Sequence, residues 1–112
     1  MKYLLLVFVD ELRSHGMSRT ERDIHDADCQ TSLAALQSSG QVVCAQCLPQ
    51  SEPATVVQIQ NGRVVIGDFP PCGRDLHLSD LLLVEARDFN AVIRVASRLP
   101  HARMGPIEIR TR

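Results

Sequence analysis

The residues of this sequence that could move a proton near neutral pH are its histidines and a set of carboxylates. The segment 67–77, GDFPPCGRDLH, holds the first candidate pair, Asp68 and His77. A carboxylate beside a histidine orients one ring nitrogen and raises its basicity, which suits a general acid or base. Asp68 ends one predicted strand and His77 precedes the next, so a turning loop would bring them together. In the alternative interpretation, Asp68 caps a turn before proline and His77 faces solvent.

His25 is the second candidate for acid–base work, on the helix predicted to begin at Ser18. At 100° per residue, it shares one side of that helix with Arg22 and Cys29. This side is the inward one, so the imidazole would reach a cleft beneath the helix. The alternative is a histidine at an interface near the exposed start of the helix.

Three further charged residues complete the candidate set. Asp10 and Glu11 close the first predicted strand, where a carboxylate beside a cleft could be a base or an orienting group. Either carboxylate could equally end the strand in water. Arg74 would hold a substrate carboxylate through its bidentate guanidinium, or it is a solvated loop charge.

The cysteines do not form a recognisable metal or redox motif. Cys44 and Cys47 have C-x-x-C spacing, but they stand in a predicted strand, where their side chains point to opposite faces. A redox pair stands instead at a helix start. A zinc site would need further ligands, such as Cys72 and His77, at an unfamiliar spacing. Phosphate-loop, dinucleotide, nucleophile-elbow and zinc-protease motifs are absent from the sequence. We therefore expect no metal and no cofactor.

The elements that must position these residues follow the order β-α-β, β-hairpin, β-α-β. A Ser-x-x-Glu capping box at Ser18 begins the first helix, and Gly40 is a natural stop. Asn61 and Gly62 join two β-rich runs, which predicts a type I′ hairpin turn because both residues tolerate positive φ. The predicted strands cover 3–9, 41–48, 54–60, 63–67, 79–86 and 106–111, and the helices cover 18–39 and 88–100.

Without the hairpin, this order is the βαββαβ skeleton of a ferredoxin-like α+β fold, an antiparallel sheet with two helices on one face. The 112 residues fit one domain, 1–112. No third helix is predicted for the other face of the sheet, which must still be covered. We therefore expect a homodimer joined sheet to sheet.

The amino-acid composition argues against two classes of binding partner, nucleic acids and membranes. The net charge is −1 with histidines neutral, so the chain lacks the basic face of a nucleic-acid-binding domain or of a protein that binds anionic membranes. No apolar run approaches the roughly 18 residues of a membrane span. The run 3–9 is followed at once by Asp10, which indicates a buried strand and not a signal peptide. A cytoplasmic location is the default expectation.

Several strings, in their order along the whole chain, carry a family resemblance. They are the opening MKYLLLVFVDE, the hairpin ATVVQIQNGRVV, and the ending SDLLLVEARDFNAVIRVASRLP with GPIEIRTR. Together they resemble the YCII-related family of bacterial proteins, specifically its DGPF branch. The sequence departs from the signature of this branch, because Asp68, Phe69, Pro70 and Pro71 stand where Asp-Gly-Pro-Phe is usual.

The resemblance implies a dimeric α/β barrel in which two sheets face each other and enclose a cleft. YCII-type proteins are proposed to use a His–Asp pair as general acid and base, and DGPF-type proteins are often associated with sigma factors. We therefore expect a small-molecule cleft at a dimer interface, with cofactor-free, lyase-like or isomerase-like catalysis. His77 or His25 would act there with Asp68 or Asp10. The alternative is a non-catalytic dimeric binding or regulatory module, for which the resemblance implies a sigma factor as the partner.

Overall fold

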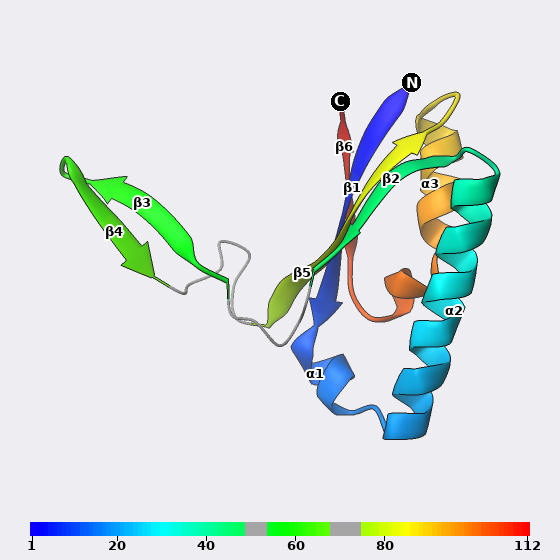
Figure 1. Ribbon diagram of the computed structural model, residues 1–112, viewed down its shortest axis with the longest axis horizontal. Coiled ribbons are helices and arrows are strands. Elements are labelled where there is room, and N and C mark those ends of the chain that lie inside the picture. Colours follow the sequence, from blue (N-terminus) through cyan, green and yellow to red (C-terminus); the bar gives the residue numbers. More distant parts are fainter. Residues whose placement is uncertain (49–53, 68–74) are drawn as a thin grey trace.

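The computed structural model describes residues 1–48, 54–67 and 75–112 (Figure 1). Asp68 and Arg74 therefore lie outside the described residues. Within the described ranges the chain is α+β, as predicted, with a four-stranded antiparallel sheet, a separate two-stranded sheet and three α-helices. The elements are β1 (Lys2–Asp10), α1 (Glu11–His15), α2 (Arg19–Ser38), β2 (Val42–Cys47), β3 (Val56–Gln60), β4 (Arg63–Gly67), β5 (Leu76–Glu85), α3 (Phe89–Arg98), the 3₁₀ helix η1 (Pro100–Arg103) and β6 (Ile107–Thr111).

The main sheet has the strand order β2-β5-β1-β6, and α2 and α3 lie on the same side of it (Figure 1). Alternate residues of β1 are buried toward the helices, because successive side chains of a strand point to opposite faces. Leu5, for example, is fully buried and pairs with Leu82 of β5 on one side and Ile109 of β6 on the other. The buried core consists of Tyr3, Leu5, Val7, Val42, Leu82, Val84, Val92, Val95, Ala96 and Leu99.

The opposite face of this sheet is apolar along its two central strands, β1 and β5. Its residues come from the alternate positions of the two central strands, and we call them the open sheet face: Leu4, Leu6, Phe8, Leu81 and Leu83. Leu4 is 37% exposed and the others are half-buried. None of the described helices lies on this side (Figure 1). The prediction that two helices cover one face of the sheet is thus confirmed for the described residues.

The helix starts follow their sequence signals. The Ser18 hydroxyl accepts a hydrogen bond from the Glu21 amide at 3.1 Å, and the Glu21 carboxylate accepts one from the Ser18 amide at 3.3 Å, which completes the predicted capping box. Asp88 caps α3 by accepting from the Ala91 amide at 2.8 Å. The predicted inward side of α2 is confirmed too, since Arg22, His25, Cys29, Leu33 and Leu36 are its half-buried positions, with Ser32 beside them.

Two local features differ from the sequence prediction. Residues 11–15 form the short helix α1, which was not predicted because five residues carry no readable periodicity. Strand β5 begins at Leu76 and not at Ser79, because a β-bulge lets the strand continue past the polar residues near its start.

The hairpin β3–β4 forms as predicted. Asn61 has φ 52° and Gly62 has φ 76°, the two positive values that a type I′ turn requires. In Figure 1 the hairpin projects away from the main sheet, on the side opposite the helices. None of the described helices is both long and apolar enough to cross a membrane.

Candidate functional site

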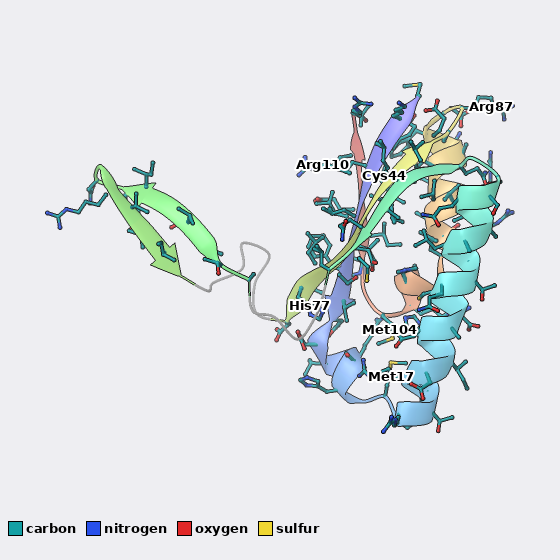
Figure 2. The ribbon with its side chains drawn as sticks, in the orientation of Figure 1. Met17, Cys44, His77, Arg87, Met104 and Arg110 are labelled. Carbon is teal, nitrogen blue, oxygen red and sulfur yellow. The ribbon has the colours of Figure 1, made fainter. Side chains whose placement is uncertain are left out.

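A cavity of about 540 Å³ lies on the helix side of the main sheet, beneath α2. Met17 and Met104 are part of its lining and lie between the lower end of the sheet and α2 (Figure 2). Its wall is mostly apolar, and the polar side chains that could act on a ligand converge from four elements. They include Arg22, His25, Asp26 and Cys29 of α2, Cys47 of β2, Asp80 of β5 and His101 of η1.

Asp80 faces this cavity because it alternates regularly with Leu82 and Val84 on the buried face of β5, and a β-bulge lies just before it in the strand. In the β1–β5 pairing, Val7 is opposite Asp80 and Phe8 is opposite Leu78, so Ser79 is the extra residue. The Ser79 hydroxyl lies 2.9 Å from the Asp80 carboxylate and 3.2 Å from the Val7 carbonyl, its two possible acceptors. Asp80 is only 8% exposed. The regular alternation of β5 therefore holds a buried carboxylate at the inner wall of the cavity.

His101 approaches Asp80 from the other end of the chain. It follows Pro100 at the start of η1 and is 8% exposed. Its Nε2 atom lies 3.9 Å from Oδ2 of Asp80, within ion-pair range but beyond hydrogen-bond distance. Its Nδ1 atom is buried and has no hydrogen-bond partner among the described residues. An unpaired buried nitrogen costs free energy.

The surroundings keep the His101 imidazole neutral. Burial lowers the pKa of His101, because the charged form loses its hydration. The negative charge of Asp80 acts in the opposite direction and raises this pKa, while a positive charge on His25 lowers it. A neutral imidazole beside a carboxylate can accept a proton, and the carboxylate then stabilises the imidazolium.

His25 and Cys29 face the same cavity one helical turn apart. The Sγ atom of Cys29 lies 3.4 Å from Nε2 of His25. Burial and, to a lesser extent, the charge of Asp80 raise the pKa of the Cys29 thiol to about 11. The pKa of the Cys47 thiol is also raised, first by burial and then by Asp80. Both thiols are therefore protonated near neutral pH, so neither is an activated thiolate nucleophile.

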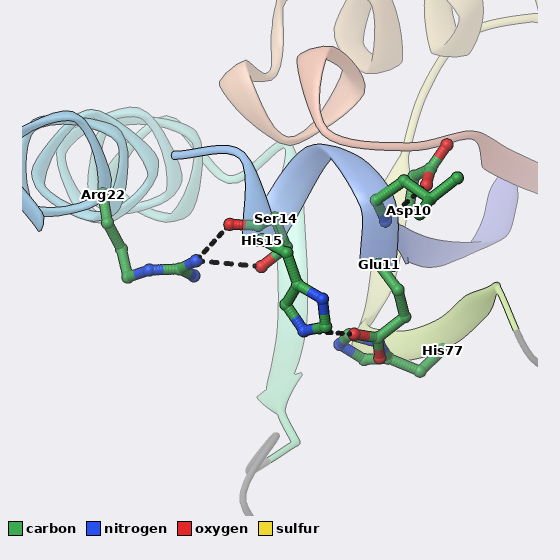
Figure 3. Close-up of polar contacts among 7 residues, drawn as sticks. Asp10, Glu11, Ser14, His15, Arg22 and His77 are labelled. Carbon is green, nitrogen blue, oxygen red and sulfur yellow. Dashed lines mark hydrogen bonds and ion pairs between the residues drawn. The ribbon is translucent and has the colours of Figure 1, made fainter. Parts of the chain in front are cut away.

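Arg22 fixes the rim of the cavity. Its Nη2 atom donates to the carbonyl oxygen of Ser14 and lies 3.1 Å from the Ser14 hydroxyl oxygen (Figure 3). Ser14 is buried within α1, so this contact ties the short helix to the start of α2. The guanidinium thus keeps a positive charge beside the cavity, while its Nη2 atom holds α1 against the start of α2 through Ser14.

A second histidine–carboxylate pair lies outside the cavity lining, where β5 and α1 begin. The Nδ1 atom of His77 is 2.5 Å from Oε1 of Glu11, and His15 lies 3.5 Å from the other carboxylate oxygen (Figure 3). The His77 contact is not aligned as a hydrogen bond, because neither ring nitrogen has an aligned partner among the described residues. We regard it as an electrostatic contact whose strength depends on the protonation of His77.

The candidate residues named from the sequence lie at separate places in the structure. His25 lines the cavity beside Cys29. Asp10 is the N-cap of α1, where its Oδ1 atom accepts from the Leu12 amide at 3.0 Å, so it has a structural role in this position. His77 contacts Glu11, while its proposed partner Asp68 lies outside the described residues, as does Arg74.

The two cysteines of the C-x-x-C spacing lie in strand β2, as predicted. Cys44 is opposite Leu83 and Cys47 is opposite Asp80 in the β2–β5 pairing, so the two thiols are on opposite faces of the sheet. Among the described residues, no group of three or more His, Cys, Asp or Glu side chains could hold a metal ion.

The sequence alone did not identify the pair Asp80 and His101, and it indicated Glu11 without His77 as its partner. A signal existed for Asp80, because Ser79 and Asp80 interrupt an otherwise apolar strand, and polar residues in a buried strand are often functional. For His101 no comparable signal existed, since a histidine after a helix-ending proline is an ordinary surface residue by pattern.

No protein-family model matches this chain, and no curated protein matches it either.

Proposed function

We propose that this protein binds a small molecule in the cavity beneath α2 and catalyses cofactor-free acid–base chemistry on it. The observation that carries this proposal is the buried pair Asp80 and His101, 3.9 Å apart on the wall of a cavity that also holds His25. Perturbed titratable groups that converge on one cavity are typical of catalytic sites. The volume of about 540 Å³ suits a metabolite-sized ligand.

The proposed chemistry is the transfer of a proton from one atom of the substrate to another. Neutral His101 takes a proton from an acidic C–H, and Asp80 stabilises the resulting imidazolium. The electron pair left on carbon is delocalised into an adjacent carbonyl of the substrate. His25, which also lines the cavity, returns a proton at a second position, and the two histidines are reset by exchange with solvent. No net oxidation occurs, so no cofactor is needed, and the outcome is an isomerisation.

Arg22 is the group we propose for binding the anionic end of such a substrate. Its guanidinium lies at the rim and uses Nη2 for Ser14, which leaves further N–H donors. A carboxylate held there would place the neighbouring carbons between His25 and His101. A small oxo acid or hydroxy acid is therefore the substrate class that we would test first.

Hydrogen–deuterium exchange provides the direct test. A panel of small oxo acids is incubated with the protein in D₂O, and NMR follows the loss of carbon-bound protons. We expect exchange with at least one acid, and a loss of about 10²–10⁴-fold in rate for His101→Gln. His15→Gln is the matched control, because His15 is exposed and does not line the cavity. Equal exchange rates in wild type, His101→Gln and His25→Gln would overturn the assignment.

A non-catalytic binding module is the second candidate. It is favoured by the hydrogen bond between Ser79 and Asp80, which gives the carboxylate a structural partner independent of His101. This alternative predicts that thermal-shift screening finds a ligand whose protons never exchange. Thermal-shift and NMR exchange measurements on the same samples therefore distinguish catalysis from binding alone.

We further propose that the chain has the ferredoxin-like topology of the YCII-related family and forms a homodimer through the open sheet face, as in a dimeric α/β barrel. The strand order β2-β5-β1-β6 and the apolar character of that face support this. The catalytic cavity then belongs to each protomer and not to the interface, because it lies on the helix side. Light scattering at about 10 µM should give twice the chain mass, and a monomer would reject the dimer.

A further inference from the structure

The β3–β4 hairpin has one completely apolar face. In the hairpin register, Val57 is opposite Ile66 and Ile59 is opposite Val64, so the four side chains share a face. We call it the hairpin apolar face. Its members are 62–76% exposed, which makes them the most exposed cluster of large aliphatic residues in the described chain. The other face carries Gln58, Gln60, Arg63 and Val65.

This amphipathic pattern needs a partner. A two-stranded hairpin is at best marginally stable in water, and its stability requires that an apolar face be buried. The described elements of the same chain do not provide that burial, because all four aliphatic side chains remain exposed in the folded chain. The hairpin projects on the side of the main sheet that the helices leave open (Figure 1).

We propose that the hairpin is a dimerisation arm whose apolar face packs against the open sheet face of a second copy of this chain. This inference rests on the homodimer proposed above and specifies what covers its sheets. Both surfaces are apolar at their centres. At the edge of the sheet face, Arg110 and Glu108 of β6 are opposite Leu4 and Leu6, and they pair with each other at 3.4 Å, so neither is left as an unpaired ion. Because every copy carries both surfaces, a two-fold axis satisfies both arms at once and closes the assembly.

The dimensions of the two surfaces match. Strands of five residues are about 17 Å long, and four adjacent strands span about 14–19 Å, so one arm reaches across the sheet. The hairpin apolar face offers on the order of 400 Å², and each sheet patch a comparable area. Two arms on two sheets thus bury on the order of 1,600 Å², the size of a standard stable interface.

Ile59 and Gln58 provide a matched pair of variants. They are neighbours on β3, both are exposed, and their side chains point to opposite faces of the hairpin. We expect Ile59→Lys to raise the dimer dissociation constant at least about tenfold, because it places a charge in the interface. Gln58→Lys adds the same charge on the outer face and should leave the constant unchanged. Sedimentation over a concentration series measures both, and circular dichroism checks that each variant is folded.

Cross-linking identifies the surface that the arm contacts. A photo-reactive residue is placed at position 59, and dimers are formed from isotopically light and heavy chains. We expect cross-links that join this residue in one chain to peptides of β1 or β5 in the other chain. The same residue in place of Gln58 should not form them. A monomeric wild type would reject the arm together with the proposed dimer. A wild-type dimer that Ile59→Lys leaves equally tight, or cross-links confined to one chain, would reject the arm alone.

Discussion

Asp80 and His101 lie 3.9 Å apart, and each is 8% exposed, although one belongs to a bulged strand and the other to a 3₁₀ helix near the end of the chain. Their proximity depends on the face of β5 that Asp80 shares with Leu82 and on the turn that returns the chain from η1 to β6. In that turn the Asp10 amide donates to the Met104 carbonyl at 2.7 Å and the Phe8 amide to Pro106 at 3.0 Å.

Removing the charge of Asp80 should change the titration of His101. The carboxylate raises the pKa of His101 against the effect of burial, so Asp80→Asn should lower that pKa further. NMR titration of the ring protons measures the shift. Asp23→Asn is the control, because Asp23 is an exposed position of α2 that does not line the cavity. A rise in the pKa of His101 in Asp80→Asn would show that the pair does not interact as described.

The stability of the fold should fall in mild acid because of His101. Its pKa in the folded state is lower than the ordinary value of 6.5 that it has in the unfolded chain. At a pH between the folded-state pKa and 6.5, the unfolded chain therefore binds more protons than the folded chain. The contribution of neutral, buried His101 to the free energy of unfolding is therefore fully present above pH 6.5. It is lost as the pH falls toward the folded-state pKa. Melting temperatures between pH 8 and 5 should show a smaller decline for His101→Gln than for the wild type. His15→Gln, at an exposed position, should retain the wild-type decline.

The thiol of Cys29 should react slowly with alkylating reagents. Because its pKa is about 11, its rate of alkylation should rise about tenfold for each pH unit between 8 and 10. Exposed Cys44 should be modified first, as peptide mapping by mass spectrometry can show. Asp80→Asn should accelerate the modification of Cys29, since the charge of Asp80 raises the pKa of this thiol. Labelling of Cys29 ahead of Cys44 at pH 8 would contradict its burial.

Gly105 should not tolerate a side chain. A Cβ atom at this buried position would meet the carbonyl oxygen of Phe8, a backbone atom that cannot move aside independently. We expect Gly105→Ala to reduce the free energy of unfolding by about 1–3 kcal/mol, as overpacking does. Gly67→Ala is the control, because nothing lies within 4 Å of its Cβ and the change should be within about 0.5 kcal/mol. Denaturant titration compares them, and equal stability would refute the close approach.

Local signals in the sequence were enough to predict most of the elements. The capping box at Ser18, the cap at Asp88 and the Asn61–Gly62 turn all formed, because each depends on neighbouring residues alone. Helical periodicity also identified His25 and Cys29 as inward-facing. The short helix α1 was missed, since five residues carry no periodic signal.

The sequence by itself thus determined an α+β chain with a hairpin, an apolar sheet and an inward histidine on α2. The tertiary structure alone decided which carboxylate meets which histidine. Glu11 reaches His77, and Asp80 reaches His101, only because strand register, a bulge and chain reversals bring distant residues together. Such contacts depend on packing between elements far apart in the chain, and one-residue shifts of register would turn Asp80 to the other face of the sheet.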